Sequence, residues 1–276
     1  MRFAALCLAF GLAATSCGGG RATQLRYPGA PAAFDRSASD AKALEIADKV
    51  FAAAGGPGHW DAAKQLKWHQ VYSDNGQAKL DGEVAWDRWN ARHWAMLHRA
   101  DGMDASVGYE IYGEFMVGQT QPQKEKMTHP AHVMGHDEIA HGVEVAKKRF
   151  NSDTGLLALQ FVMLDPGATI KYVGPAKDVS GNETGDELLV TFSDPARKDT
   201  DFHPVVDRTT NLITRIEMTH PGTTERSGYS LDQWTTVGGL KFATARKDLA
   251  TSETVAITDL TVGAPDDNLF IAPVGG

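Results

Sequence analysis

The sequence predicts a mainly β protein with helices, an α+β fold whose antiparallel strands form one strongly curved sheet. From Gln65 onward, apolar and polar residues alternate over short runs, which is the side-chain period of a β-strand. Turn-forming groups such as Asp74-Asn75-Gly76 and Gly238-Gly239 separate these runs. Two stretches, near residues 40–54 and 137–150, instead repeat apolar residues at helical spacing, and we expect them to cover the apolar face of the sheet.

The first residues are typical of an export signal. Met1-Arg2 is a basic start, an apolar run follows from Phe3 to Ala14, and the small residues Thr15-Ser16 precede Cys17. The apolar run is shorter than the roughly 20 residues of a membrane-spanning helix. We predict that residues 1–16 are a signal peptide removed on export; an ordinary secretory signal, or an apolar start to the fold, is the alternative.

Cys17 is also the predicted membrane anchor. It resembles the acylated cysteine of the bacterial lipoprotein lipobox, and Cys7 lies in the segment that is removed. Each buried methylene contributes about 0.8 kcal/mol and stable anchoring takes about two acyl chains, so acylation of one cysteine with palmitate-type chains suffices. Gly18 stands in place of the aspartate that often signals inner-membrane retention, which favours the outer membrane, facing the periplasm.

Composition limits the partners of this chain. It has 27 basic and 35 acidic residues, and loss of Arg2 with the signal leaves 26 basic residues, a net charge of −9. A negative balance disfavours nucleic acid and electrostatic adhesion to anionic lipid. With one cysteine left after cleavage, no intramolecular disulfide can form.

The mature chain begins with a tether and a helix. Residues 17–38 are rich in Gly, Ala, Pro and Ser and predict a lipidated tether, and residues 39–276 form the predicted folded domain. We expect Ser39 to cap a helix that Gly55-Gly56-Pro57-Gly58 ends. His59-Trp60 then begins a short connection to the first strand.

The next strands follow from turns and alternation. A strand starting at Gln65, a hairpin around Asp74–Gly76 and two strands joined near Asn90 are expected. The alternation from Val107 to Val117 predicts one half-buried strand. The last part of the chain is predicted to consist of strands near residues 169–173, 187–192, 202–207, 212–218, 225–231, 241–247 and 254–262.

A second helical stretch separates these two sets of strands. It is expected to run from Asp137 to Phe150, after which Asn151-Ser152-Asp153 caps a further apolar stretch from Leu156 to Leu164. Periodicity alone leaves open whether that stretch is a buried helix or a strand.

Several segments resemble a known family. They are the opening helix that ends in Ala54-Gly55-Gly56, the stretch from Leu157 to Gly167, the strand–turn–strand from Glu187 to Ile213 and the closing stretch from Gly239 to Phe270. They resemble lipoprotein-sorting proteins of the LolA/LolB-like superfamily over most of residues 40–273, through motifs that describe β-geometry and not chemistry. The resemblance implies an antiparallel half-barrel with a helical lid, and in the sorting carriers its apolar hollow holds the acyl chains of a lipoprotein.

The resemblance therefore implies a lipid-binding half-barrel here, with a lipid or acyl chain, and other lipoproteins, as candidate partners. A half-barrel presents inward apolar side chains that a lid or a lipid must cover. The expected lid is Leu156 to Met163. The expected lining comprises nine side chains: Trp86, Tyr109, Ile111, Phe115, Leu157, Phe161, Leu188, Val190 and Phe192. The alternative is a non-enzymatic structural or interaction lipoprotein whose half-barrel is filled by its own lid.

Signals for catalysis are weak. Four histidines lie close together beside two acidic residues: His129, His132, His136 and His141. A metal-dependent enzyme using this His129–His141 cluster is a third hypothesis, but Pro130 and Gly135 interrupt the helix that paired ligands would need. We therefore expect no metal site, no cofactor and no enzymatic activity.

A cluster of aromatic and basic residues has two interpretations. Its members are Trp86, Trp89, Trp94, Arg88 and Arg92. They could hold a sugar or an anion by stacking and ion pairing. The favoured interpretation is an amphipathic strand pair with solvated arginines.

Overall fold

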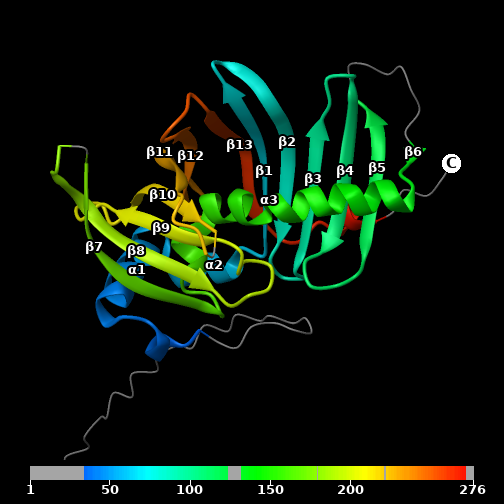
Figure 1. Cartoon of the computed structure of the whole chain (residues 1–276). Coiled ribbons are helices and arrows are strands. Elements are labelled where there is room, and N and C mark those ends of the chain that lie inside the picture. The colour runs from blue at the N-terminus through cyan, green and yellow to red at the C-terminus, as the bar shows by residue number, and fades with distance from the viewer. Residues whose placement is uncertain (1–33, 124–131, 179, 221, 272–276) are drawn as a thin grey trace, which may run out of the picture.

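The computed structural model describes residues 34–123, 132–178, 180–220 and 222–271. Within these residues, thirteen strands form one antiparallel sheet in the order β6-β5-β4-β3-β2-β1-β13-β12-β11-β10-β9-β8-β7. The sheet is strongly curved, and its edge strands β6 and β7 do not pair with each other, so it is an open half-barrel (Figure 1). The predicted fold class, mainly β with a curved antiparallel sheet, is confirmed.

The strands fall into two sets on either side of a central seam. The first set is β1 (Gln65–Asp74), β2 (Gln77–Asp87), β3 (Arg92–His98), β4 (Met103–Glu110), β5 (Met116–Pro122) and β6 (His132–Val133). The second set is β7 (Ala168–Lys177), β8 (Glu183–Phe192), β9 (Asp201–Val206), β10 (Ile213–Thr219), β11 (Ser227–Val237), β12 (Leu240–Asp248) and β13 (Thr254–Gly263). The seam is the pairing of β1 with β13, which places Gln65 opposite Gly263 and Tyr72 opposite Val255.

Most strand predictions are confirmed, and one is wrong. Asn75 and Gly76 both have positive φ angles, 49° and 75°, as a tight two-residue hairpin turn requires. The single strand expected from Val107 to Val117 is instead two strands, because the chain turns between Glu110 and Met116. The amide of Glu110 donates to the carbonyl of Phe115 across this turn. Apolar and polar residues also alternate through the turn, so the sequence pattern did not reveal that the chain reverses direction there.

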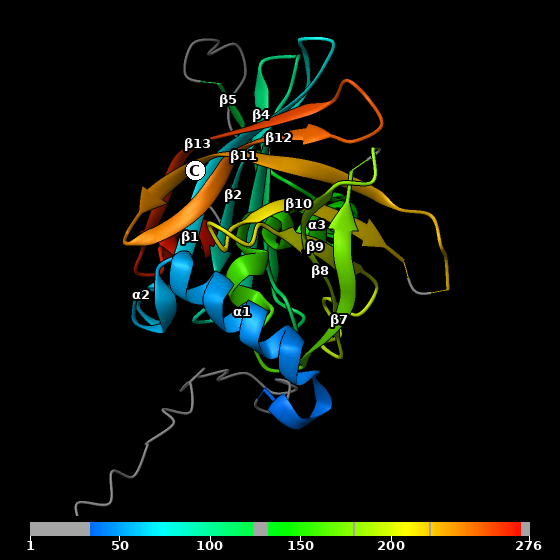
Figure 2. The ribbon, with the colours of Figure 1, turned by 90° about the vertical axis from the view of Figure 1, so that its left-hand side faces the viewer.

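Two helices near the N-terminus cover one end of the half-barrel, α1 (Ala41–Ala53) and α2 (Gly56–Ala62), as Figure 2 shows. The break between them is at Gly55, whose φ of 127° suits glycine and whose added Cβ would lie 2.3 Å from the Gly239 carbonyl oxygen. Pro57 stands in the first turn of α2, where its missing N–H costs nothing. The glycine-rich segment therefore ends one helix, as predicted, and starts another.

The prediction that Ser39 caps α1 is wrong by one residue, because Asp40 occupies that position. The Ser39 hydroxyl and the Asp40 carboxylate instead accept hydrogen bonds from the amides of Ile170 and Tyr172 on β7, both at 2.9 Å. Two short 3-10 helices complete the described chain, η1 (Arg36–Ala38) and η2 (Asp267–Phe270). The segment before α1 thus covers part of an edge strand that would otherwise present unpaired amides.

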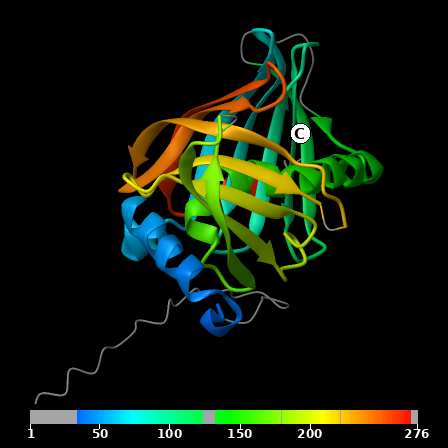
Figure 3. The same cartoon turned by 60° about the vertical axis from the view of Figure 1, so that its left-hand side comes forward.

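The long helix α3 (His136–Val162) lies across the concave side of the sheet and contacts β4, β5 and β12 (Figures 1 and 3). The predicted cap at Asn151-Ser152-Asp153 is wrong, since the helix continues through it. Asp153 is paired with Arg149 one turn earlier, and the Thr154 hydroxyl donates to the Phe150 carbonyl, so neither side chain competes for a helix start. The stretch after Asp153 is therefore helical. Among the residues that the structure describes, α3 and the other helices lack the length and apolar character of a membrane-spanning helix.

Gly155 allows α3 to approach the sheet. A Cβ at this position would lie 2.5 Å from Cζ of Phe202, a fully buried ring that also packs against Phe192. We expect Gly155→Ala to lower the free energy of unfolding by about 1–2 kcal/mol, because overpacking outweighs the better helix propensity of alanine. Urea denaturation provides the measurement. Gly58→Ala in α2, where nothing lies within 4 Å of the added Cβ, is the control and should not destabilise the protein.

Candidate functional site

The concave face of the half-barrel is occupied by side chains from the sheet and from α3. The structure brings six of the nine predicted lining residues into one hydrophobic cluster, each 0–7% exposed: Trp86, Leu157, Phe161, Leu188, Val190 and Phe192. Tyr109 belongs to a smaller neighbouring cluster under the first half of α3, and Ile111 contacts both clusters. Phe115, on the β4–β5 turn, is 44% exposed and lies outside both.

The second half of α3, the predicted lid, fills the deep part of the concave face. Phe161 stacks on Trp60 of α2 with ring centroids 4.5 Å apart, and it meets Phe242 of β12 edge-on at 5.6 Å. Leu157 and Leu159 are likewise fully buried in the same cluster. The second half of α3 is thus part of the core, and the open space beside this helix lies along its first half.

A charged group is buried where the two halves of α3 meet. Asp153 accepts hydrogen bonds from the Tyr72 hydroxyl at 3.2 Å and from Arg149 at 3.1 Å. Arg246 of β12 is buried nearby and makes no hydrogen bond to the described residues. Burial lowers the pKa of Arg246, while the negative charge of Asp153 and the nearby Tyr72 raise it. The negative charge of Asp153 thus offsets part of the cost of burying the guanidinium.

His93 of β3 lies under α3 between two aromatic rings. Its ring centroid is 5.3 Å from that of Phe150 and 5.4 Å from that of Tyr109. Neither imidazole nitrogen, nor the Tyr109 hydroxyl, makes a hydrogen bond to the described residues. Burial lowers the pKa of His93 to about 4, so the imidazole is neutral at pH 7.

Because this imidazole is buried in its neutral form, we expect the free energy of unfolding to depend on pH. The unfolded chain binds a proton at His93 below about pH 6.5, and the folded chain does so only below about pH 4, so the stability is fully present above pH 6.5 and is lost as the pH falls between these values. We expect His93→Phe to flatten the slope of unfolding free energy against pH in this window. Urea denaturation at pH 4, 5, 6 and 7 measures it, and equal slopes for the two proteins would contradict the assignment.

An open hollow of about 620 Å³ lies beside the first half of α3, between the β4–β5 and β8–β9 connections. We call it the mouth hollow. Its lining consists of Tyr109, Ile111, Tyr112, Gly113, Glu144, Lys147, Lys148, Phe150, Pro195, Ala196 and Asp199. Apolar groups of the sheet and of α3 contribute much of this surface, and the two lysines come from α3.

The two loops beside the mouth hollow are tied to each other. The Tyr112 hydroxyl donates to the Asp194 carboxylate at 2.5 Å, which joins the β4–β5 turn to the β8–β9 connection. Arg197 belongs to the same β8–β9 connection. Its guanidinium lies 4.7 Å from the ring centroid of Phe150 and 5.0 Å from that of Trp86. The cationic group thereby lies over aromatic faces, a favourable arrangement for a buried guanidinium.

Sequence reasoning placed two residues in this hollow, Tyr109 and Ile111, and missed the β8–β9 connection. Pro195 and Ala196 belong to no motif and are distant in sequence from α3. The only available signal was the solvent-facing pair Lys147-Lys148 on a helix whose other face is apolar. Loops that close over a site are positioned by tertiary packing, which has no local period.

The aromatic and basic cluster does not form one site. Trp86 lies in the main concave cluster, whereas Trp94 packs with Ala85 and Phe270 in a separate cluster. Arg88 donates to the carbonyls of Trp60 and Ala63 at 2.8 and 2.6 Å, so the expectation of solvated arginines is wrong. Arg92 pairs with Asp87 and Asp267, and these guanidiniums act as structural links.

The histidine cluster is only partly described. His129 and the side chain of His132 lie outside the described residues, while His136 and His141 are exposed near the start of α3. Cys17 and the predicted signal peptide also lie outside them. The predicted metal alternative and the predicted anchor therefore stay predictions.

Comparisons with known proteins find similarity at the level of structure. No family model and no curated protein matches the chain. A DUF1329 family protein from Desulfovibrio piger is 11% identical, with a TM-score of 0.49 over 83% of this chain and 97% of that one. A LolA superfamily protein from Nitrosomonas europaea is 10% identical, with a TM-score of 0.47 over 83% and 97%.

A further solved structure has a similar description. A putative outer membrane lipoprotein-sorting protein domain from Vibrio parahaemolyticus is 10% identical, with a TM-score of 0.44 over 83% of this chain and 96% of that one.

Proposed function

We propose that this chain is an exported, lipid-anchored protein that binds the hydrophobic part of a lipid or lipoprotein acyl chain in the mouth hollow. The observation that carries the proposal is the hollow itself, about 620 Å³ beside α3. This volume is in the range of about 300–1,000 Å³ that small-molecule sites occupy. An apolar surface open to water at this position would be stabilised by an acyl chain that covers it.

The residues around the hollow suggest an amphipathic ligand with a negative head. Ile111 and Phe150 offer apolar surface, and Lys147 and Lys148 offer positive charge on the α3 side. Lys148 pairs with Glu144 at 2.7 Å, an exposed pair that a competing anion can replace at low cost. The ammonium group of Lys147 lies 5.4 Å from the centroid of Tyr109, at the border between the apolar and the charged parts. A fatty acid or an anionic phospholipid matches both parts.

The test compares two substitutions on the same loop. We expect delipidated and refolded protein to take up palmitate in native mass spectrometry, and Ile111→Asp to abolish this uptake because a carboxylate desolvated by an alkyl chain is unfavourable. Phe115→Asp is the matched control, since this exposed side chain lies outside the lining and should leave uptake unchanged. Equal uptake by wild type and Ile111→Asp would refute the mouth hollow as the site.

A second candidate is an interaction lipoprotein with no exchangeable ligand. Full burial of Leu157 and Phe161 favours it, because the deep concave face is filled by the chain's own side chains. In that case the refolded wild-type protein, with its circular dichroism spectrum intact, takes up no palmitate. The same native mass spectrum therefore decides between the two candidates.

A further inference from the structure

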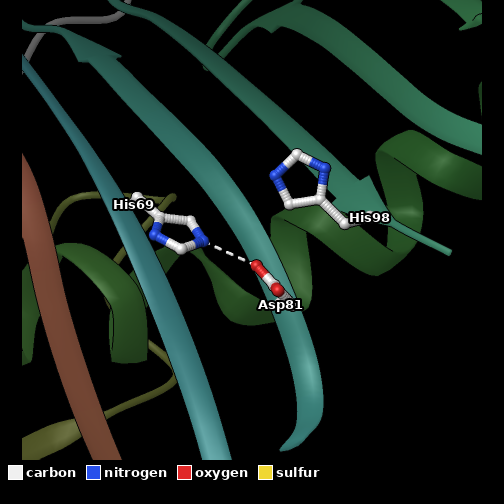
Figure 4. Close-up of side chains that lie close together, drawn as sticks. All are labelled: His69, Asp81 and His98. Atoms are coloured by element: carbon white, nitrogen blue, oxygen red, sulfur yellow. Dashed lines mark hydrogen bonds and ion pairs between the residues drawn. The ribbon is translucent and has the colours of Figure 1, made fainter. Parts of the chain in front are cut away.

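A second group of chemically reactive side chains lies on the other face of the sheet. His69, Asp81 and His98 come from the neighbouring strands β1, β2 and β3, and Figure 4 shows the two imidazoles on either side of the carboxylate. In β1, Trp68 and Gln70 are buried on the concave face, so the intervening His69 points to the opposite face. This group is therefore separated by the sheet from α3 and from the mouth hollow.

The three side chains converge closely enough to share one ion. Each offers one ligand atom, and these atoms all lie within 4.8 Å of one another. Nε2 of His69 is 2.6 Å from Oδ1 of Asp81, and the two imidazole centroids are 5.8 Å apart. Zinc bonds of about 2.0–2.1 Å place tetrahedral ligand atoms roughly 3.3 Å apart, so small side-chain rotations would suffice.

Each imidazole is held through its other nitrogen. Nδ1 of His98 is 2.8 Å from Oδ1 of Asp104 on β4, and Nδ1 of His69 is 3.0 Å from Oγ1 of Thr258 on β13. An ionised carboxylate can only accept, so Nδ1 of His98 carries the proton and Nε2 keeps its lone pair. By the same rule Nε2 of His69 donates to Asp81 in this structure, and a bound metal ion would replace that proton. The Thr258 hydroxyl donates to Asp259, so it can accept from Nδ1 of His69 once Nε2 binds the ion.

Such outer partners are typical of metal-binding histidines. In protein metal sites, the second ring nitrogen usually donates to a carboxylate or another oxygen, which fixes the tautomer and the ring orientation. Asp104 already gives His98 this support, and His69 has an oxygen partner, Thr258, in place at its second nitrogen. A simple ion pair would need only His69 and Asp81. The second imidazole, His98, with its own partner Asp104, therefore favours a metal site over an ion pair.

The ligand types select the class of ion. Two imidazoles and one carboxylate suit zinc and other first-row divalent ions better than magnesium or calcium, which prefer oxygen ligands. Three protein ligands leave a coordination position open. The side chains of His69, Asp81 and His98 are 26%, 43% and 26% exposed, and Asp81 and His98 also line a surface hollow of about 660 Å³. Solvent and a small ligand can therefore reach the group.

We propose that His69, Asp81 and His98 form a zinc-binding site on the face of the sheet opposite α3, with Asp104 and Thr258 as the outer partners of the two histidines. The site is independent of acyl-chain binding and would persist if the mouth hollow held no ligand. The ion would also link β1, β2 and β3 near the C-terminal end of β3.

Calorimetric titration of the full-length chain, purified in detergent and treated with EDTA, tests the proposal with zinc chloride as the probe. We expect one zinc ion per chain. Asp81→Asn and His98→Gln should each weaken binding by at least about 10-fold, and Asp104→Asn, which removes an outer partner, by about 10–100-fold. Zinc should raise the Tm of the wild type and leave that of Asp81→Asn unchanged.

Two controls make the result decisive. His220→Gln alters an exposed histidine whose Nδ1 is 2.8 Å from the Asp199 carbonyl, outside the group, and should bind zinc like the wild type. The double variant His136→Gln, His141→Gln removes the exposed histidines at the start of α3 and should also bind normally. Wild-type affinity in folded Asp81→Asn and His98→Gln, or loss of binding in the double variant alone, would overturn the proposal.

Discussion

Replacing Asp153 with alanine is expected to lower the free energy of unfolding by about 3–5 kcal/mol, the usual cost of leaving a buried charge uncompensated. Asp153 is buried in the middle of α3 and accepts hydrogen bonds from Tyr72 and Arg149. Its negative charge also favours the protonated form of the buried Arg246. Alanine keeps the helix but removes both the acceptor and the charge.

Urea denaturation measures this loss of stability, and two further variants show whether the charge of Asp153 causes it. Asp153→Asn keeps the size and one acceptor oxygen, so most of the loss should remain if the charge is what matters. Glu144→Ala breaks the exposed pair with Lys148 on the same helix and should cost only about 0.3–0.5 kcal/mol. A loss below about 1 kcal/mol in Asp153→Ala would mean that water reaches Arg246.

Replacing Cys17 with serine is expected to release the protein from the membrane almost completely. Without acyl chains, no buried methylenes hold the chain on the bilayer. The predicted mature chain, with 26 basic and 35 acidic residues, provides no compensating attraction to anionic lipid. Ultracentrifugation of osmotically lysed cells and incorporation of labelled palmitate are the measurements.

Cys7→Ser is the matched control for this experiment. It removes the other cysteine of the chain, from the segment predicted to be cleaved, and should leave both the label and the sedimentation unchanged. Sedimentation of Cys17→Ser with the membranes, or loss of label in Cys7→Ser, would contradict the assignment of the anchor.

Strands were predictable wherever a turn signal and alternation agreed. Asn75-Gly76 located the first hairpin because only a few residue types adopt positive φ in two consecutive positions. The turn between Glu110 and Met116 has no such signal, so the alternation of Val107 to Val117 appeared continuous. Asp153 resembled a helix cap because its true partners could not be read from the local sequence. One of them, Tyr72, is 81 residues away.

The candidate sites were hard to predict for the same reason, because their residues are far apart in the sequence. Leu188 and Val190 lie in the main concave cluster, because strand alternation determines which face a residue occupies. Whether that face is filled or open depends on how deeply α3 is seated, which no local pattern encodes. His69, Asp81 and His98 are separated by 12 and 17 residues, spacings that match no known ligand motif and become adjacent only through strand register.

The seam between β1 and β13 has a consequence for biogenesis. It pairs the first long strand with the last, so closing it requires a loop of almost the whole domain and cannot occur until the C-terminal strand is available. Contacts of such high sequence separation slow folding. If the chain is exported as predicted, it would therefore still be unfolded when Cys17 becomes available for acylation. Late pairing of β1 with β13 would then keep the polypeptide competent for translocation.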